Sequence, residues 1–116
     1  VAYPVQCAAA AVLARPKELY PAIARVQRNA DRLREALEGA GLSVYGGENS
    51  PYLWVETPRK TTSMAFFSQL LSQLGLAVTP GSGFGEGGEG FVRFSALGRE
   101  ADVREACARL RGIAFS

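Results

Sequence analysis

The chain has 116 residues, a length that suits one domain with a single hydrophobic core. With 47% hydrophobic and 21% charged residues, its composition is that of a globular chain rather than a disordered one. The net charge of +2 is too small to indicate binding to nucleic acid or to a membrane surface. The absence of histidine excludes a histidine-based metal site, catalytic triad or proton shuttle within this chain.

The two cysteines, Cys7 and Cys107, form no CxxC pair. Each lies among alanines at helical spacing, so both are predicted to be buried free thiols, which favours a reducing, cytoplasmic setting. No apolar run approaches the roughly 18 residues that a membrane span requires. The sequence opens on VAYPVQCAAAAVLA without an initiator methionine, and we therefore expect it to be a piece of a longer protein.

Helical patterns dominate the first forty residues. Residues 6–14 are alanine-rich and predict a helix that ends before Pro16. A long amphipathic helix is predicted to begin at Pro16 or Lys17 and to end at Glu38, because glycines follow it. Its apolar residues recur at alternating steps of four and three and form one stripe, made of Leu19, Ile23, Val26, Ala30, Leu33, Leu37 and Ala40. Four arginines that lie mostly off this stripe predict a solvated face: Arg25, Arg28, Arg32 and Arg34.

Strand patterns follow in the second half of the chain. Residues 42–45 and 52–55 predict two short strands joined by the turn GGENSP. Thr61 or Thr62 is the predicted N-cap of a third helix that ends at Gly75. Residues 76–79 and 90–95 predict two more strands, and residues 99–110 predict a closing helix. This order predicts an α/β chain of the α+β two-layer type, a small mixed sheet of three or four strands with helices packed on one face.

Residues 79–95 read TPGSGFGEGGEGFVRFS, and six of the ten residues from 81 to 90 are glycine. Gly83, Gly85 and Gly88 fit the pattern GxGxxG, but that nucleotide-binding motif needs a helix directly after it, and here a strand pattern follows. A nucleotide site is therefore rejected. Two interpretations stay open, a mobile strand connection with a purely structural role, and a ligand-facing loop in which Ser82 and backbone N–H groups donate hydrogen bonds.

A single arginine stands in the apolar strand pattern that follows the glycines. Strand alternation places Arg93 on the same face as Phe91 and opposite to Val92. An arginine among aromatic residues is costly to bury without an anion, and its planar fork matches a carboxylate. Arg93 is therefore a candidate carboxylate-binding residue. The alternative is an exposed strand arginine, or one paired with Glu86 or Glu89.

The segments YGGENSPYLWVETP and TPGSGFGEGGEGFVRFSALG resemble the C-terminal part of the LL-diaminopimelate aminotransferases, which are fold-type I, pyridoxal-phosphate-dependent aminotransferases of class I/II. The opening VAYPVQCAAAAVLARPKELY also resembles the family's stretch just after the cofactor-binding core, so the resemblance covers nearly the whole chain. PGSGFG followed by VR and S is shared broadly among class I/II aminotransferases, whereas GG-x-N-[AS]-P-Y-x-W points to the diaminopimelate group. The resemblance implies the aminotransferase small-domain fold for residues 1–116, with residues 1–15 as the connection from a large domain.

The resemblance also implies a reaction and a set of site residues. The family transfers an amino group between LL-diaminopimelate and 2-oxoglutarate, on the route to lysine, with pyridoxal phosphate as the electron sink. By this resemblance Arg93 holds the substrate α-carboxylate, Asn49 lines the site, and Ser82 and Phe84 lie near the substrate entrance. No catalytic, cofactor-binding or metal-binding residue is assigned within the chain.

Departures from the family pattern limit what this chain can do alone. Its only lysines, Lys17 and Lys60, lack the Ser-x-x-Lys context of the Schiff-base lysine, so the chain is predicted to bind no pyridoxal phosphate covalently and to be inactive by itself. The whole enzyme is expected to be a homodimer. The chain alone is expected to expose apolar surface, including alanines 8–11, and to self-associate.

Two alternative functions remain at this point. One is another class I/II aminotransferase, acting on aspartate, alanine or an aromatic amino acid. The other is a non-catalytic module that binds small carboxylates or a protein partner.

Overall fold

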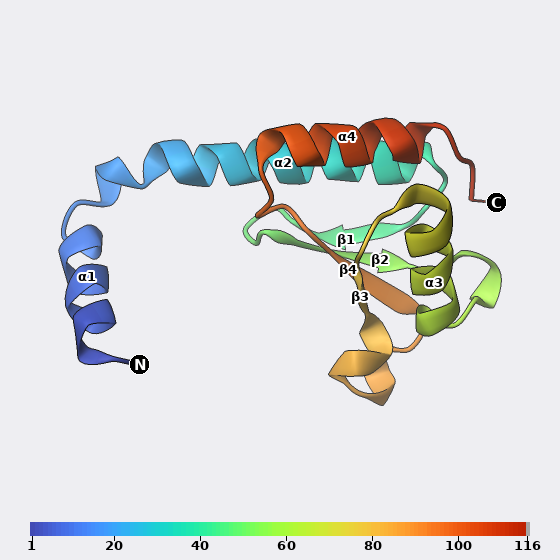
Figure 1. The fold of residues 1–116 in the computed structure, drawn as a ribbon, viewed down its shortest axis with the longest axis horizontal. Coiled ribbons are helices and arrows are strands. Elements are labelled where there is room, and N and C mark those ends of the chain that lie inside the picture. The colour runs from blue at the N-terminus through green and yellow to red at the C-terminus, as the bar shows by residue number, and fades with distance from the viewer. Residues whose placement is uncertain (116) are drawn as a thin grey trace.

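The computed structural model describes residues 1–115, except for the side chain of Lys60. Four α-helices and four strands make up its framework (Figure 1). The helices are α1 (Tyr3–Leu13), α2 (Tyr20–Gly39), α3 (Ser63–Leu74) and α4 (Glu100–Arg111). The strands are β1 (Val44–Gly46), β2 (Tyr52–Glu56), β3 (Thr79–Pro80) and β4 (Phe91–Ser95). Short 3₁₀ turns lie between them: η1 (Pro16–Glu18), η2 (Pro58–Lys60), η3 (Gly81–Phe84) and η4 (Glu86–Gly88).

The strands form one sheet in the order β1-β2-β4-β3. The predicted α+β class is confirmed, but the sheet is not mixed, because all three strand pairs are antiparallel. The mixed sheet was expected because a helix separates β2 from β3, which is typical of a parallel crossover. Both strands do run in the same direction, but β4 lies between them, so they do not pair.

One face of the sheet carries the core. The inward residues of β2 and β4 are Leu53, Val55, Val92 and Phe94. Helices α2 and α4 lie side by side along this face, and α3 packs beside them, so the expectation of helices on one face is confirmed (Figure 1). Each helix contributes a buried stripe to the same cluster, for example Leu37, Leu70 and Leu110.

Local signals account for the bounds of α3. The side chain of Thr62 accepts a hydrogen bond from the N–H of Ala65 at 3.2 Å, as an N-cap does, and Gly75 ends the helix with φ 64°. The third strand is shorter than the predicted residues 76–79. Only Thr79–Pro80 is paired, because Leu76 and Val78 pack against the core without joining the β4 ladder.

Helix α1 and the first turns of α2 project away from the sheet (Figure 1). The predicted stripe of α2 is buried only in its second half, whereas Ile23 is 59% exposed and no residue of α1 is buried. Figure 1 shows α1 and the first turns of α2 extending beyond the rest of the fold. Within residues 1–115, no helix is both long and apolar enough to cross a membrane.

The two cysteines are both free, but they lie in different surroundings. Cys107 is buried in the core as predicted, and that burial raises the pKa of its thiol. The predicted burial of Cys7 is wrong, since this residue lies on the exposed helix α1.

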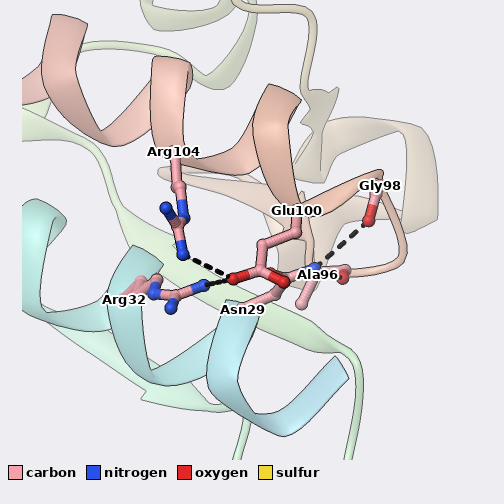
Figure 2. Close-up of polar contacts among 6 residues, drawn as sticks. All are labelled: Asn29, Arg32, Ala96, Gly98, Glu100 and Arg104. Carbon is pink, nitrogen blue, oxygen red and sulfur yellow. Dashed lines mark hydrogen bonds and ion pairs between the residues drawn. The ribbon is translucent and has the colours of Figure 1, made fainter. Parts of the chain in front are cut away.

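Polar side chains of α2 hold the ends of the strands. Asn29 is fully buried, and its amide nitrogen donates to the carbonyl oxygens of Ala96 and Gly98, each at 3.1 Å (Figure 2). This ties the link between β4 and α4 to a helix almost seventy residues away in sequence. The amide oxygen of Asn29 is buried and has no hydrogen-bond partner among the described residues.

Beside Asn29, a carboxylate joins α2 to α4. Glu100 accepts from Arg32 at 2.7 Å and from Arg104 at 2.9 Å, and these bonds lower the pKa of its carboxyl (Figure 2). Arg34 donates to the carbonyl oxygens of Val44 and Gly46 in β1. The predicted solvated face is therefore correct for Arg25 and Arg28 only, because Arg32 and Arg34 are half-buried and bind other elements.

We expect the change Asn29→Leu to lower the free energy of unfolding by about 1–3 kcal/mol, because the buried bond to Ala96 and the partly buried bond to Gly98 are both lost. Arg28→Leu, at the exposed neighbouring position of the same helix, is the matched control and should stay within about 0.5 kcal/mol of the wild type. Urea unfolding, followed by the emission of the single tryptophan, measures both values. Equal stabilities for the two variants would contradict the role given to Asn29.

Candidate functional site

Arg93 lies on the face of the sheet that the helices leave open. In β4 it alternates with the buried Val92 and Phe94, as predicted, and across the ladder it lies opposite Trp54 of β2. Tyr52 and Trp54 share this open face, because they alternate with the buried Leu53. The same period-two pattern in YLWVE could have shown that these two rings face the same side as the arginine.

Two aromatic rings contact the guanidinium of Arg93. Its Cζ atom lies 4.3 Å from the ring centroid of Tyr52 and 4.8 Å from that of Phe84. The Nε atom is buried without a hydrogen-bond partner, and the described residues offer Arg93 no ion pair. The alternative pairing with Glu89 or Glu86 is therefore not formed, and Glu89 instead accepts from the N–H of Ser63 at 2.8 Å.

One of the two rings that contact Arg93, Phe84, belongs to a continuous aromatic row on the open face. Tyr45 meets Phe91 edge to face at 6.3 Å, and Phe91 stacks on Trp54 at 5.4 Å with an interplanar angle of 15°. Trp54 in turn meets Phe84 edge to face at 5.8 Å. Such pairs restrain one another beyond the area they bury, so Phe84 and Trp54 each limit the movement of the other.

The glycine-rich loop is closed at its base by a contact between two backbone segments. A Cβ atom added to Gly81 would lie 2.0 Å from the carbonyl oxygen of Gly88, and one added to Gly88 would lie 2.0 Å from that of Gly81. The hydroxyl of Ser63 bonds the same base, because it donates to Gly88 and accepts from the N–H of Gly90 at 3.0 Å. The loop is thus built from two 3₁₀ turns, η3 and η4, on a fixed base.

The other loop glycines differ in whether their backbone conformation requires glycine. Gly85 and Gly90 have φ of 113° and 84°, values that other residues rarely adopt, whereas a Cβ at Gly83 would meet nothing within 4 Å. The loop leads into strand β4 and not into a helix, which agrees with the rejection of a nucleotide site. Phe84, at the end of η3, is the loop residue brought against Arg93.

The other two predicted site residues lie elsewhere. Ser82 is exposed in η3, two residues before Phe84. Asn49 is exposed in the turn between β1 and β2, where it lines a largely apolar groove of about 430 Å³ together with Ile23, Val26 and Leu97. Arg93 does not line this groove, so the structure brings Phe84 to Arg93 but does not bring Asn49 into contact with it.

The residues around Arg93 do not fit pyridoxal phosphate by themselves. Lys17 lies in η1, within the projecting N-terminal segment, and the side chain of Lys60 lies outside the described residues. The base of the glycine loop is filled by its own backbone and forms no open cradle for a phosphate. No step through the cofactor is therefore derived from this chain.

The change Gly81→Ala should destabilise the chain by about 1–3 kcal/mol, since the new methyl group overlaps the Gly88 carbonyl. It should also change the emission of Trp54, because the displaced loop carries Phe84. Gly83→Ala is the control, and its free energy of unfolding should equal or slightly exceed that of the wild type, because its Cβ meets open space. Similar destabilisation by both changes in urea unfolding would contradict a fixed loop base.

Comparisons with known proteins agree on one family. The family model for aminotransferase class I and II matches residues 2–110. The chain is 46% identical over 95 residues to the LL-diaminopimelate aminotransferase of Phocaeicola vulgatus, covering 82% of the chain and 23% of that protein. It is 44% identical over 114 residues to the LL-diaminopimelate aminotransferase of Azobacteroides pseudotrichonymphae, covering 97% of the chain and 28% of that protein.

A solved structure gives the same result. The L,L-diaminopimelate aminotransferase of Chlamydomonas reinhardtii matches with a TM-score of 0.79 and 39% identity, over 86% of this chain and 24% of that one. The chain thus spans about a quarter of the length of the relatives that it matches. Since the family model covers almost all of the sequence, the chain belongs to the aminotransferase class I and II family.

Proposed function

We propose that this chain is the C-terminal small domain of a pyridoxal-phosphate-dependent aminotransferase acting on LL-diaminopimelate with 2-oxoglutarate, and that Arg93 binds the substrate α-carboxylate. The observation that supports this proposal is the state of Arg93. Its cation is half-buried against aromatic rings, and the described residues supply no anion to pair with it. Burying part of a cation without a partner is costly, so an anion from outside the chain would relieve that cost.

The chemistry of the guanidinium limits the proposed role of this chain to substrate binding. It carries five N–H donors and no acceptor, so it binds and orients a carboxylate but moves no proton. A carboxylate that approaches the terminal nitrogens can accept two parallel hydrogen bonds, which fixes its orientation as well as its position. Pyridoxal phosphate supplies the electron sink in this family, and the residues that hold it are proposed to lie outside this chain.

The remaining site residues have weaker support. Phe84 touches the Arg93 guanidinium and is exposed, which suits a residue at the entrance to the carboxylate site. Ser82 belongs to the same turn and is proposed to lie near that entrance. Asn49 is proposed to line the substrate site of the whole enzyme from the turn between β1 and β2.

The proposal extends to the whole protein. Residues 1–15 would connect this domain to a large domain that holds the cofactor, which suits an N-terminal segment without buried residues. The whole enzyme is proposed to be a cytoplasmic homodimer.

We expect 2-oxoglutarate to change the emission of Trp54 in a saturable manner, because Trp54 lies opposite Arg93 in the ladder. Arg93→Leu should weaken this binding by at least about thirtyfold, since losing a charge-assisted carboxylate pair costs about 2–5 kcal/mol. Arg28→Leu, which removes an exposed arginine of α2, is the charge-matched control and should keep wild-type affinity. Equal affinities of the two variants for 2-oxoglutarate would contradict the assignment of Arg93 as the carboxylate-binding residue.

The exposed apolar residues of the N-terminal segment predict self-association of the chain. They include Val1, Tyr3, Val5, Val12, Leu13, Tyr20 and Ile23. Light scattering should give a mass above that of a monomer, and Leu13→Glu should reduce it, because a charge would enter the contact. Leu71→Glu, at an exposed apolar position of α3, serves as the control. A strictly monomeric wild type over the whole concentration range would contradict this expectation.

A further inference from the structure

We propose that Tyr52 and Phe84 form an aromatic clamp that positions the Arg93 guanidinium for its carboxylate. This inference rests on the proposed carboxylate role of Arg93 and adds two positioning residues to it. The observation behind it is that rings, and no carboxylate of the described chain, contact this cation. The clamp is defined as these two side chains.

Aromatic rings, and no anion of the described chain, hold Arg93 in place. Arginine side chains are usually oriented by carboxylates or backbone carbonyls, because these accept the guanidinium N–H bonds. None of the described residues does so for Arg93, whose Nε atom is buried without a partner. The two ring contacts, at 4.3 and 4.8 Å, are within the range of cation–π attraction and take over the orienting role.

The sheet and the glycine loop fix the two rings themselves. Tyr52 stands on β2, directly opposite Ser95 in the ladder with β4, so its backbone cannot shift relative to Arg93 without breaking the pairing. Phe84 comes from the glycine loop, whose base is closed by the contact between Gly81 and Gly88. Trp54 packs against the edge of Phe84 at 5.8 Å and supports it from the sheet.

The clamp leaves the terminal nitrogens of Arg93 accessible. Two aromatic rings contact the guanidinium and its Nε atom is buried, whereas the terminal nitrogens of Arg93 are not among the buried atoms without a partner. An incoming carboxylate is thereby directed to the terminal N–H groups. Holding a flexible side chain in its binding conformation before the ligand arrives reduces the entropic cost of binding. Rings can do this without competing for the N–H groups, which a neighbouring carboxylate would occupy.

The test uses the 116-residue chain and two readouts. NMR of the arginine side chains measures the rate of rotation about the Nε–Cζ bond of Arg93, which the clamp should slow. Fluorescence of Trp54 measures the affinity for 2-oxoglutarate. We expect Phe84→Leu to speed up the rotation and to weaken binding by about five- to tenfold. The change Tyr52→Leu should act in the same direction, and Phe84→Tyr, which keeps the ring, should restore both values.

Tyr45→Leu is the matched control, because Tyr45 is an exposed ring of the same aromatic row and does not contact Arg93. It should leave the rotation rate and the affinity unchanged. Wild-type rotation in Phe84→Leu and Tyr52→Leu would overturn the clamp, and faster rotation with unchanged affinity would overturn its positioning role. If the wild type binds no 2-oxoglutarate, the carboxylate function fails, and the clamp loses its positioning role even if rotation responds to the variants.

Discussion

The pairing of β2 with β4 is the constraint on which the site depends. It places Leu53 opposite Phe94 and Val55 opposite Val92, so all four side chains enter the core together. A shift of one residue would turn this apolar set outward, and the cost of exposing it fixes the register. The same register commits the intervening residues to the open face, where Trp54 lies opposite Arg93. The position of the cation is therefore a by-product of packing the core.

Helix α2 adds a second constraint at the ends of the strands. Asn29 holds the segment after β4, and Arg34 holds β1, so side chains of one helix connect an edge strand with the segment that follows an inner strand. Burying Asn29 leaves its amide oxygen without a partner, which is a cost that an apolar residue would avoid. This cost is offset by the two hydrogen bonds that the amide nitrogen of Asn29 donates. Their acceptors, the carbonyl oxygens of Ala96 and Gly98, lie in the link after β4, where no neighbouring strand supplies a donor.

The sequence was sufficient for some features and not for others, and the difference is physical. Helix periodicity, the Thr62 cap and the alternation in FVRFS depend on neighbouring residues, so they located the elements and the face of Arg93. The contacts of Arg93 with Tyr52 and Phe84 depend on strand pairing and loop closure, which join residues far apart in the chain.

Two further expectations show that local sequence patterns do not report contacts between distant residues. The glycine count suggested a mobile loop, but two of those glycines are required by the close approach of Gly81 and Gly88. The sequence predicted one apolar stripe along α2, but only its second half is buried, because periodicity reports an amphipathic face and not what lies opposite it. Whether Asn49 and Ser82 belong to one site with Arg93 remains a prediction.

The order β1-β2-β4-β3 has a consequence for how copies of this chain can meet. Its edge strands are three and two residues long, and β3 ends in Pro80, which has no backbone N–H to donate. Such short edges are poor templates for adding a strand from another molecule. Contacts between copies are therefore expected to depend on side-chain packing, for example at exposed apolar positions of the helices. Assemblies built that way lack the continuous backbone pairing through which sheet edges grow into fibres.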